Sequence, residues 1–300
     1  MTTYIGIDIG GTSIKCGLVD EQGRIGRKVN RPTASTKAAI MADLDAMVRD
    51  LKADGPVDGI GVSMPGVVQK DGFLTTAGAV KPFTGINLKD ELHALTGLPV
   101  TVENDANAAA IAEQWLGAAQ NVPDYLSLVL GTGVGGALVI NNEIYRGAHA
   151  RSGEFGWMVV EDDDVDVEMG TLNFRGATVI GLIRRYNQFS AQPVDDARVI
   201  FNRSKDGEAL AQHVLRSYYY SLAKGIVNLI VAFDPEVVVI GGGISANPTF
   251  MQDLNATIHR LQMSHNSINE LTLPKVVPAV LRNDAGMIGA VYQLVKSLSI

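Results

Sequence analysis

Two glycine-tipped hairpins constrain the fold of this chain more than any other feature. The first lies in YIGIDIGGTSIKCGLVD, where an apolar strand, a glycine turn and a second strand follow one another. The segment YLSLVLGTGVGGALVINNEIY repeats that pattern about 120 residues later. Helical patterns follow each hairpin, as in KAAIMADLDAMVRDLKA, whose apolar residues share one face. Strands and helices in this order predict an α/β protein of two related halves.

The composition narrows the range of partners. With 300 residues, of which 46% are hydrophobic and 19% charged, the chain can build a large core and two domains. Its formal net charge of −7 leaves no basic surface for nucleic acid or a membrane, so small neutral substrates or magnesium-bound phosphates fit better. The single cysteine, Cys16, permits no internal disulfide, and no export signal precedes the first strand. We therefore expect a protein of the reducing cytoplasm.

Three glycine turns follow apolar strands and are candidates for phosphate binding. Glycine lets backbone N–H groups approach phosphate oxygens closely, and threonine adds a hydroxyl donor. GTGVGG formally matches a dinucleotide-binding fingerprint, but the ALVI that follows predicts a strand where that fingerprint needs a helix. No P-loop motif is present. We expect a nucleotide cleft between two domains. The residues of the turns are Gly10, Gly11, Thr12, Gly131, Thr132, Gly133, Gly241, Gly242 and Gly243.

Two charged residues lie near the first turn. Asp8 stands two residues before Gly10 and is a candidate ligand for Mg²⁺, directly or through water, because this ion prefers hard oxygen ligands. The alternative is a buried, hydrogen-bonded strand aspartate. Lys15 on the second strand is a candidate phosphate contact, with a solvated lysine at the sheet edge as the alternative.

Six motifs in order and spacing resemble the ROK family of sugar kinases over nearly the whole chain. They are DIGGTSIKCGLVD, SMPGVV, VENDANAAAIAEQWLGAA, LGTGVGGALV, RSGEFG and VIGGGIS. The resemblance implies a two-domain actin/hexokinase-like (ribonuclease H-like) ATPase fold with a cleft between the domains, ATP and Mg²⁺ as cofactors, and a homodimer. Residues 1–117 would form a smaller N-terminal α/β domain, completed by a C-terminal helix at 285–300, and residues 118–284 a larger one.

The resemblance also assigns roles to single residues. Asp105 of ENDAN would be the catalytic base, and its place at a helix N-terminus would hold it ionised. A plain N-cap is the alternative for this aspartate. Asn104 would bind a sugar hydroxyl and Glu154 the hydroxyls of the sugar ring. The same pocket would be lined by Gly66, Gly78 and Ala79.

The chain departs from the usual family pattern at a zinc site. Trp157 stands where most members have a zinc-binding histidine, and no cysteine follows Cys16, so the ligand count excludes structural zinc. By spacing, Asn173 replaces a second sugar-binding glutamate. An asparagine would relax the demand for a free anomeric hydroxyl. Trp157 would either stack on a second sugar ring or fill the space of the lost metal.

This pattern of departures resembles the zinc-less β-glucoside kinases of the family. It implies ATP-dependent phosphorylation of the 6-hydroxyl of the non-reducing glucose of β-glucosides such as cellobiose. A glucokinase and an N-acetylmannosamine or other hexose kinase remain alternatives. A non-catalytic sugar-binding regulator is an alternative of a different class. Regulators of the family carry a DNA-binding winged helix before the first glycine turn, which here begins at Gly10, so the kinase is favoured.

One acidic stretch stands apart from these motifs. Six carboxylates lie between Glu161 and Glu168, and their mutual repulsion and spacing do not fit a calcium loop. We expect a solvated loop at the rim of the sugar pocket.

Overall fold

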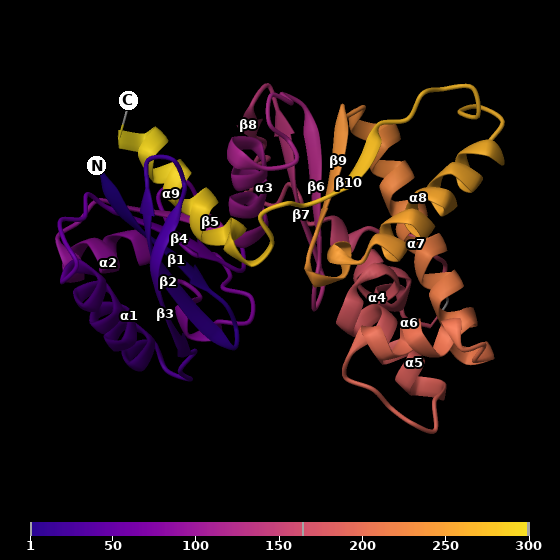
Figure 1. The fold of residues 1–300 in the computed structure, drawn as a ribbon, viewed down its shortest axis with the longest axis horizontal. Coiled ribbons are helices and arrows are strands. Elements are labelled where there is room, and N and C mark those ends of the chain that lie inside the picture. The colour runs from indigo at the N-terminus through magenta and orange to yellow at the C-terminus, as the bar shows by residue number, and fades with distance from the viewer. Residues whose placement is uncertain (1, 164, 299–300) are drawn as a thin grey trace. The chain divides into compact units, whose positions relative to one another are not determined.

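The computed structural model describes residues 2–163 and 165–298. The described chain divides into two compact units (Figure 1). Unit 1 contains residues 2–121, 146–151 and 280–298, and unit 2 contains residues 122–145 and 152–279. Within the described residues, no helix combines the length and the apolar character needed to cross a bilayer.

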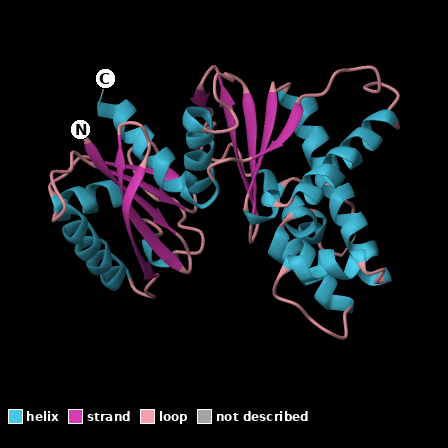
Figure 2. Ribbon diagram, in the orientation of Figure 1, coloured by secondary structure: helices cyan, strands magenta, loops and turns pink. Residues whose placement is uncertain are grey.

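Unit 1 is built on a five-stranded sheet of order β3-β2-β1-β4-β5. Figure 2 distinguishes the strands from the helices by colour. Strands β2 and β3 are antiparallel to their neighbours, whereas β4 and β5 run parallel to β1. The strands are β1 (Thr3–Ile9), β2 (Ser13–Asp20), β3 (Ile25–Pro32), β4 (Ile60–Met64) and β5 (Val100–Asn104), and the α-helices are α1 (Lys37–Lys52), α2 (Leu88–Thr96), α3 (Asp105–Leu116) and α9 (Ala285–Leu298).

Residues of β1 alternate between two covered faces of the unit 1 sheet. Ile5 and Ile7 belong to a core cluster that also contains the apolar face of α1. Tyr4 and Gly6 face α9, and a Cβ on Gly6 would lie 2.9 Å from the Met287 carbonyl oxygen. The predicted apolar face of α1 is buried, which confirms the helical pattern. The opposite face of the sheet therefore approaches α9 closely.

Unit 2 is built on a second five-stranded sheet, of order β10-β9-β6-β7-β8. Its strands are β6 (Tyr125–Leu130), β7 (Val134–Ile140), β8 (Glu143–Ile144), β9 (Val237–Gly241) and β10 (Lys275–Pro278). Its α-helices are α4 (Leu172–Gly176), α5 (Arg184–Phe189), α6 (Ala197–Lys205), α7 (Ala209–Phe233) and α8 (Pro248–Met263), and a π-helix spans Thr178–Ile183. The long helix α7 is largely buried, as its apolar sequence predicts.

The two sheets have the same topology. In each, an antiparallel hairpin and a third strand are followed by two strands parallel to the first, so that β1 to β5 correspond in order to β6 to β10. This confirms the duplication predicted from the two hairpins, and with it the α/β fold class.

One buried carboxylate holds the chain near its first exit from unit 1 and its last return to it. Glu113 on α3 is 1% exposed. It accepts hydrogen bonds from the amides of Ala118 at 2.8 Å and Leu281 at 2.8 Å, and also from the amide of Val280. A Cβ on Gly117 would lie 2.1 Å from Glu113 Oε2, so the residue that follows α3 has to be glycine.

Candidate functional site

Predicted site residues gather at one edge of the unit 1 sheet. Strands β1, β4 and β5 are parallel, so their carboxyl ends meet at the same edge. Gly10 follows β1, Gly66 follows β4, and Asp105 follows β5. A Cβ on Gly11 would lie 2.6 Å from the Cβ of Ala79, which brings the first glycine turn against the predicted sugar-pocket backbone.

A polar row crosses this sheet near the same edge. It consists of Lys15, Asp8, Ser63 and Glu103, which are lateral neighbours on successive strands and therefore share a face. Ser63 Oγ donates to Asp8 Oδ1 at 3.1 Å, and Lys15 Nζ lies 3.5 Å from Asp8 Oδ2. Gly286 at the start of α9 leaves room for the row, because a Cβ there would lie 2.9 Å from Asp8 Oδ1.

Asn104 caps helix α3 and ties it to the end of β4. Its Oδ1 accepts from the Asn107 amide at 3.0 Å, and its Nδ2 donates to the Gly66 carbonyl at 2.9 Å. An asparagine side chain has four hydrogen-bonding sites. The contacts with Asn107 and Gly66 use one acceptor site and one donor site of the four.

Asp105 opens α3, and its environment shifts its pKa upward. Its Oδ1 accepts from the Ala106 amide at 2.8 Å. The surface of Asp105 is exposed, but the surrounding protein displaces much of the water near its carboxylate. This desolvation raises the pKa of Asp105, and the negative charge of Asp8 raises it further. The Ala106 hydrogen bond opposes this shift without reversing it. The helix dipole acts in the opposite direction, so the predicted ionised state of Asp105 depends on the balance between the dipole and desolvation.

The two hairpin turns present their backbone in the same way. Gly10 N–H donates to Ser13 O at 2.9 Å, and Thr33 engages the carbonyls of Gly10 and Thr12 through its hydroxyl and amide. Within the described residues, the amides of Gly11 and Thr12 have no hydrogen-bond partner. Because the carbonyls are occupied and these amides are not, the turn fits an anion.

In unit 2 the start of the π-helix occupies the carbonyls of the glycine turn, as Thr33 does in unit 1. Gly131 O accepts from the amides of Thr178 at 3.1 Å and Val179 at 3.2 Å, and Thr132 O accepts from Ile180 at 3.2 Å. Among the residues that the structure describes, the amides of Thr132 and Gly133 have no partner. Both hairpin turns therefore offer backbone donors to a phosphate.

The third glycine turn lies against the second. Gly242 has a φ of 89°, and a Cβ there would lie 2.2 Å from the carbonyl oxygen of Leu130, the residue before Gly131. Strands β6 and β9 are parallel neighbours, with Val129 opposite Gly241, so their ends meet at one edge of the unit 2 sheet. The structure thus brings Gly131 to Gly133 and Gly241 to Gly243 together.

Asn173 links the second glycine turn to the segment that contains Glu154. Its Oδ1 accepts from the Val134 amide at 2.7 Å. It also lies 2.3 Å from where a Cβ on Gly156 would be. Glu154 is half-buried and directly precedes the short 3₁₀ helix Phe155–Trp157. The amide oxygen of Asn173 is therefore engaged by the backbone.

Trp157 points away from the core of unit 2. Its residue surface is 56% exposed, whereas its neighbour Phe155 is 6% exposed. An aromatic side chain that replaced a lost metal by filling the core would be buried. The core-filling alternative for Trp157 is therefore wrong.

The acidic stretch is only partly a solvated loop. Glu161 accepts from the hydroxyl of Ser221 and lies 3.3 Å from Arg175 and 3.7 Å from Lys224. Asp163 lies 3.6 Å from Arg175. The prediction of a solvated loop was wrong for these two carboxylates, because cations of α4 and α7 pair with them. Residues 165–168 are exposed, as predicted.

Asp8 is the carboxylate of the polar row that suits a divalent ion. Within the described part of the chain, no group of three or more His, Cys, Asp or Glu side chains could hold a metal. Mg²⁺ commonly keeps several waters and binds one or two carboxylates together with substrate phosphates. Asp8, which is part-buried and held by Ser63, fits that role.

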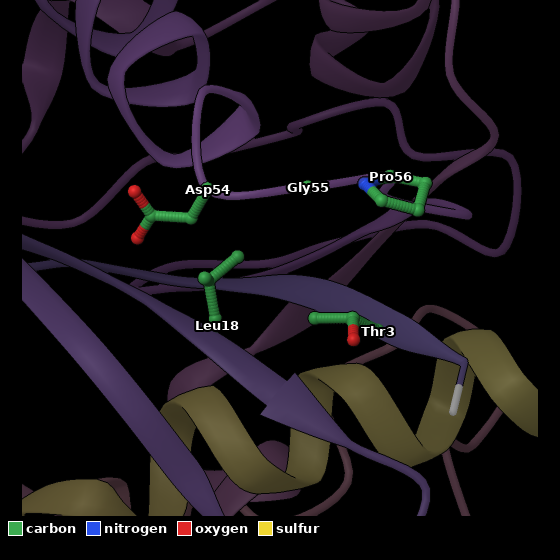
Figure 3. Close-up of a pocket in the computed structure, with 5 residues that line it drawn as sticks. All are labelled: Thr3, Leu18, Asp54, Gly55 and Pro56. Atoms are coloured by element: carbon green, nitrogen blue, oxygen red, sulfur yellow. The ribbon is translucent and has the colours of Figure 1, made fainter.

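A small pocket in unit 1 lies elsewhere (Figure 3). Its volume is about 150 Å³, and it is lined by Thr3, Leu18, Asp54, Gly55 and Pro56. Thr3 begins β1, whereas Gly10 follows the other end of that strand. None of the predicted site residues lines this pocket, and we assign it no role.

Sequence reasoning missed three residues of the site. Ser63 and Glu103 complete the polar row, and Arg146 pairs with Glu103. A signal existed for Glu103, which directly precedes Asn104 in the ENDAN motif. Lateral strand register, which places Ser63 beside Asp8, is not written in a local pattern.

Comparisons with known proteins agree with this architecture. A family model described as the ROK family matches residues 4–297. A β-glucoside kinase of Listeria monocytogenes is 36% identical over 300 residues, which cover 96% of each chain. The crystal structure of a ROK family protein from Streptococcus pneumoniae in complex with sucrose has a TM-score of 0.90 at 28% identity, covering 99% of both chains. That of a ROK family glucokinase from Streptomyces griseus with glucose and AMPPNP has a TM-score of 0.82 at 28% identity, covering 97% and 98%.

Proposed function

The chain belongs to the ROK family and is a sugar kinase, and from that premise we propose that it phosphorylates β-glucosides such as cellobiose with ATP. The acceptor would be the 6-hydroxyl of the non-reducing glucose. The observation that carries the substrate class is the exposed Trp157, three residues after Glu154, in a chain 36% identical to a β-glucoside kinase. An exposed indole offers a stacking face for a second ring.

In the proposed reaction Asp105 is the general base. The 6-hydroxyl oxygen forms a bond to the γ-phosphorus of ATP, the bond from that phosphorus to the bridging oxygen of ADP breaks, and the hydroxyl proton passes to the Asp105 carboxylate. A raised pKa suits this role, because a base is most effective when its pKa approaches the working pH.

The phosphates would be held mainly by backbone donors. The amides of Gly11, Thr12, Thr132 and Gly133 would donate to phosphate oxygens, and the turn at Gly241 to Gly243 would lie beside them. Lys15 would share its charge between Asp8 and the phosphates. Asp8 would hold Mg²⁺, directly or through water, and the ion would neutralise charge on the transferred group.

The sugar would be bound by side chains and by small residues that keep the pocket open. Asn104 and Glu154 would bind ring hydroxyls. Asn173 would tolerate a substituted anomeric oxygen, because a neutral amide engaged by Val134 does not demand a free hydroxyl. Backbone at Gly66, Gly78 and Ala79 would line the same pocket. We place this reaction in the cytoplasm, where ATP is available, and expect a homodimer.

A coupled assay of ADP release tests this proposal. Glucose, N-acetylmannosamine, fructose, cellobiose and gentiobiose should be compared, and we expect the highest kcat/KM with the two β-glucosides. Trp157→Ala should lower kcat/KM for cellobiose more than kcat/KM for glucose, because only the disaccharide has a second ring to stack on the indole. A free hexose turned over far better than any β-glucoside would contradict the proposed substrate and favour a glucokinase or another hexose kinase.

A further inference from the structure

An arginine from a distant part of the sequence holds the last carboxylate of the polar row. Glu103 is 1% exposed and lies on β5. Arg146 follows β8 in sequence but belongs to unit 1. Its Nη1 donates to Glu103 Oε1 at 2.7 Å, and its Nη2 donates to Oε2. Two parallel hydrogen bonds of this kind fix the orientation of a carboxylate as well as its position.

The same carboxylate holds the backbone around Asp105. Glu103 Oε1 also accepts from the amide of Asn104 at 2.9 Å and from Nδ2 of Asn107 at 3.0 Å. Asn104 is the N-cap of α3, and Asn107 lies in its first turn. Glu103 is thus bonded to residues on both sides of Asp105. A rotation of the Glu103 carboxylate would therefore displace both flanks of Asp105.

We propose that Arg146 is a positioning residue for phosphoryl transfer, acting through Glu103 to hold Asn104 and Asp105 in their reactive geometry. This inference rests on the proposed function, because it takes Asp105 as the base. Arg146 itself contacts neither sugar nor ATP in this scheme. A buried ion pair adds little net stability compared with apolar residues of similar size, so its geometric effect on Asp105 is the more informative property to test.

Arg146→Lys is the main test. Lysine keeps the positive charge, so Glu103 is not left unpaired, but it cannot form the two parallel hydrogen bonds. We expect kcat to fall by about 100-fold, as a displacement of about 1 Å can cause. The KM for ATP should change by less than roughly threefold, because the phosphate-binding turns are untouched. A purely structural pair would lower the unfolding temperature and leave kcat per folded molecule unchanged.

Arg203→Lys is the matched control. Arg203 on α6 of unit 2 is also largely buried, with a side chain 26% exposed against 18% for Arg146, and it donates to Gln192 O at 3.0 Å. None of its partners is a candidate site residue. We expect this variant to lower the unfolding temperature and to keep the wild-type kcat. An equal loss of kcat in both variants would overturn the inference.

Glu103→Gln keeps the test valid if Arg146→Lys does not fold. Glutamine retains one oxygen for the Asn104 amide but loses the second acceptor for Arg146. We expect a loss of kcat of roughly tenfold, again with little change in the KM for ATP. Wild-type kcat in either folded variant would overturn the inference.

The choice of substrate separates this inference from the proposed function. All variants should be assayed with the sugar that the wild-type protein uses best, whichever that is. An active wild type with fully active Arg146→Lys overturns only the positioning role. A wild type that transfers phosphate to no sugar overturns the proposed function and this inference together.

Discussion

The two units share one sheet topology but carry different side chains at the matching strand ends. In unit 1, Asp8 stands two residues before the glycine turn and lies beside Ser63 on β4. At the matching place in unit 2, Val129 stands two residues before Gly131 and lies beside Gly241 on β9. Both units offer unpartnered backbone amides at their turns, but at these matching strand positions unit 1 has a carboxylate and a hydroxyl where unit 2 has Val129 and Gly241.

This difference shows that backbone hydrogen-bond donors are common to both halves of the duplicated fold, whereas side-chain charges are not. Backbone donors at a turn depend on strand register and on a segment that occupies the carbonyls, here Thr33 in one unit and Thr178 to Ile180 in the other. Charge depends on single side chains, which can change without disturbing the sheet. The comparison predicts that side-chain changes in unit 1 affect chemistry, whereas equivalent changes in unit 2 affect only binding or stability.

The largest effect should follow from Asp105→Asn in unit 1. Asparagine can still accept from the Ala106 amide but cannot take a proton, so we expect kcat to fall by roughly 10²- to 10⁴-fold. ADP release under saturating sugar and ATP measures this. A kcat close to that of the wild type would mean that the base lies elsewhere and would break the comparison at its main point.

The same variant should be no less stable than the wild type at neutral pH. The pKa of Asp105 is raised above the ordinary aspartate value of 3.8 in the folded state, so the folded state binds the proton more tightly than the unfolded state. Ionised Asp105 therefore destabilises the fold as pH rises above 3.8. We expect Asp105→Asn to raise the unfolding temperature near neutral pH, with a gain that shrinks as pH falls. A gain that grew toward acid pH would contradict the direction of the pKa shift.

A mirrored pair of substitutions compares the two strand ends directly. Asp8→Asn should lower kcat by roughly 10- to 100-fold and raise the magnesium concentration needed for half-maximal rate, as loss of an outer ligand does. Val129→Asn places the same side chain at the matching position of unit 2. We expect it to leave the magnesium dependence unchanged. Equal shifts in both variants would show that the two strand ends contribute alike.

Two alanine substitutions test how tightly each turn is enclosed. Gly11→Ala would bring a new Cβ to 2.6 Å from that of Ala79, so we expect a loss of about 1–3 kcal/mol in the free energy of unfolding. A Cβ on Gly131 meets nothing within 4 Å, so Gly131→Ala should change that free energy by less than about 0.5 kcal/mol. Urea unfolding measures both. A larger loss for Gly131→Ala would reverse the assignment of the more enclosed turn.

The smallest expected change in the free energy of unfolding concerns the ion pairs of Glu161 in unit 2. Glu161→Gln weakens the pairs with Arg175 and Lys224 and should lower the free energy of unfolding by about 1 kcal/mol. The exposed Glu168 supplies the control, since Glu168→Gln should change it by less than about 0.5 kcal/mol. Neither variant should alter kcat. A fall in kcat for Glu161→Gln alone would mean that the charges of unit 2 take part in the chemistry.

Much of the fold could be predicted because it is encoded locally. The spacing of apolar residues gave the buried face of α1, and the glycine-tipped hairpins gave the duplicated sheets. The glycine turn after β1 and the ENDAN motif marked Gly10, Asn104 and Asp105 as candidate site residues, and the parallel strands β1, β4 and β5 bring their ends to one sheet edge. In each case the signal is a short pattern whose period or turn chemistry allows few structures.

The remainder depends on partners that are distant in sequence. Glu161 was expected in solvent because its cations, Arg175 and Lys224, belong to helices that pack beside it only in the folded chain. The direction of the pKa shift of Asp105 depends on desolvation, which no local motif reports. Arg146 is 43 residues from Glu103, so their pairing could not be read from either segment alone.

Glu113 binds the chain at its first exit from unit 1 and at its last return, and this bears on how the protein could be divided. The amides of Ala118 and Val280 bond to one carboxylate, so a short linker from residue 121 to residue 280 could close unit 1 without unit 2 and without residues 146–151. Such a truncated chain would lack Arg146 and would leave Glu103 buried without its cation. An engineer who wished to isolate the unit would therefore have to neutralise Glu103 in the same step.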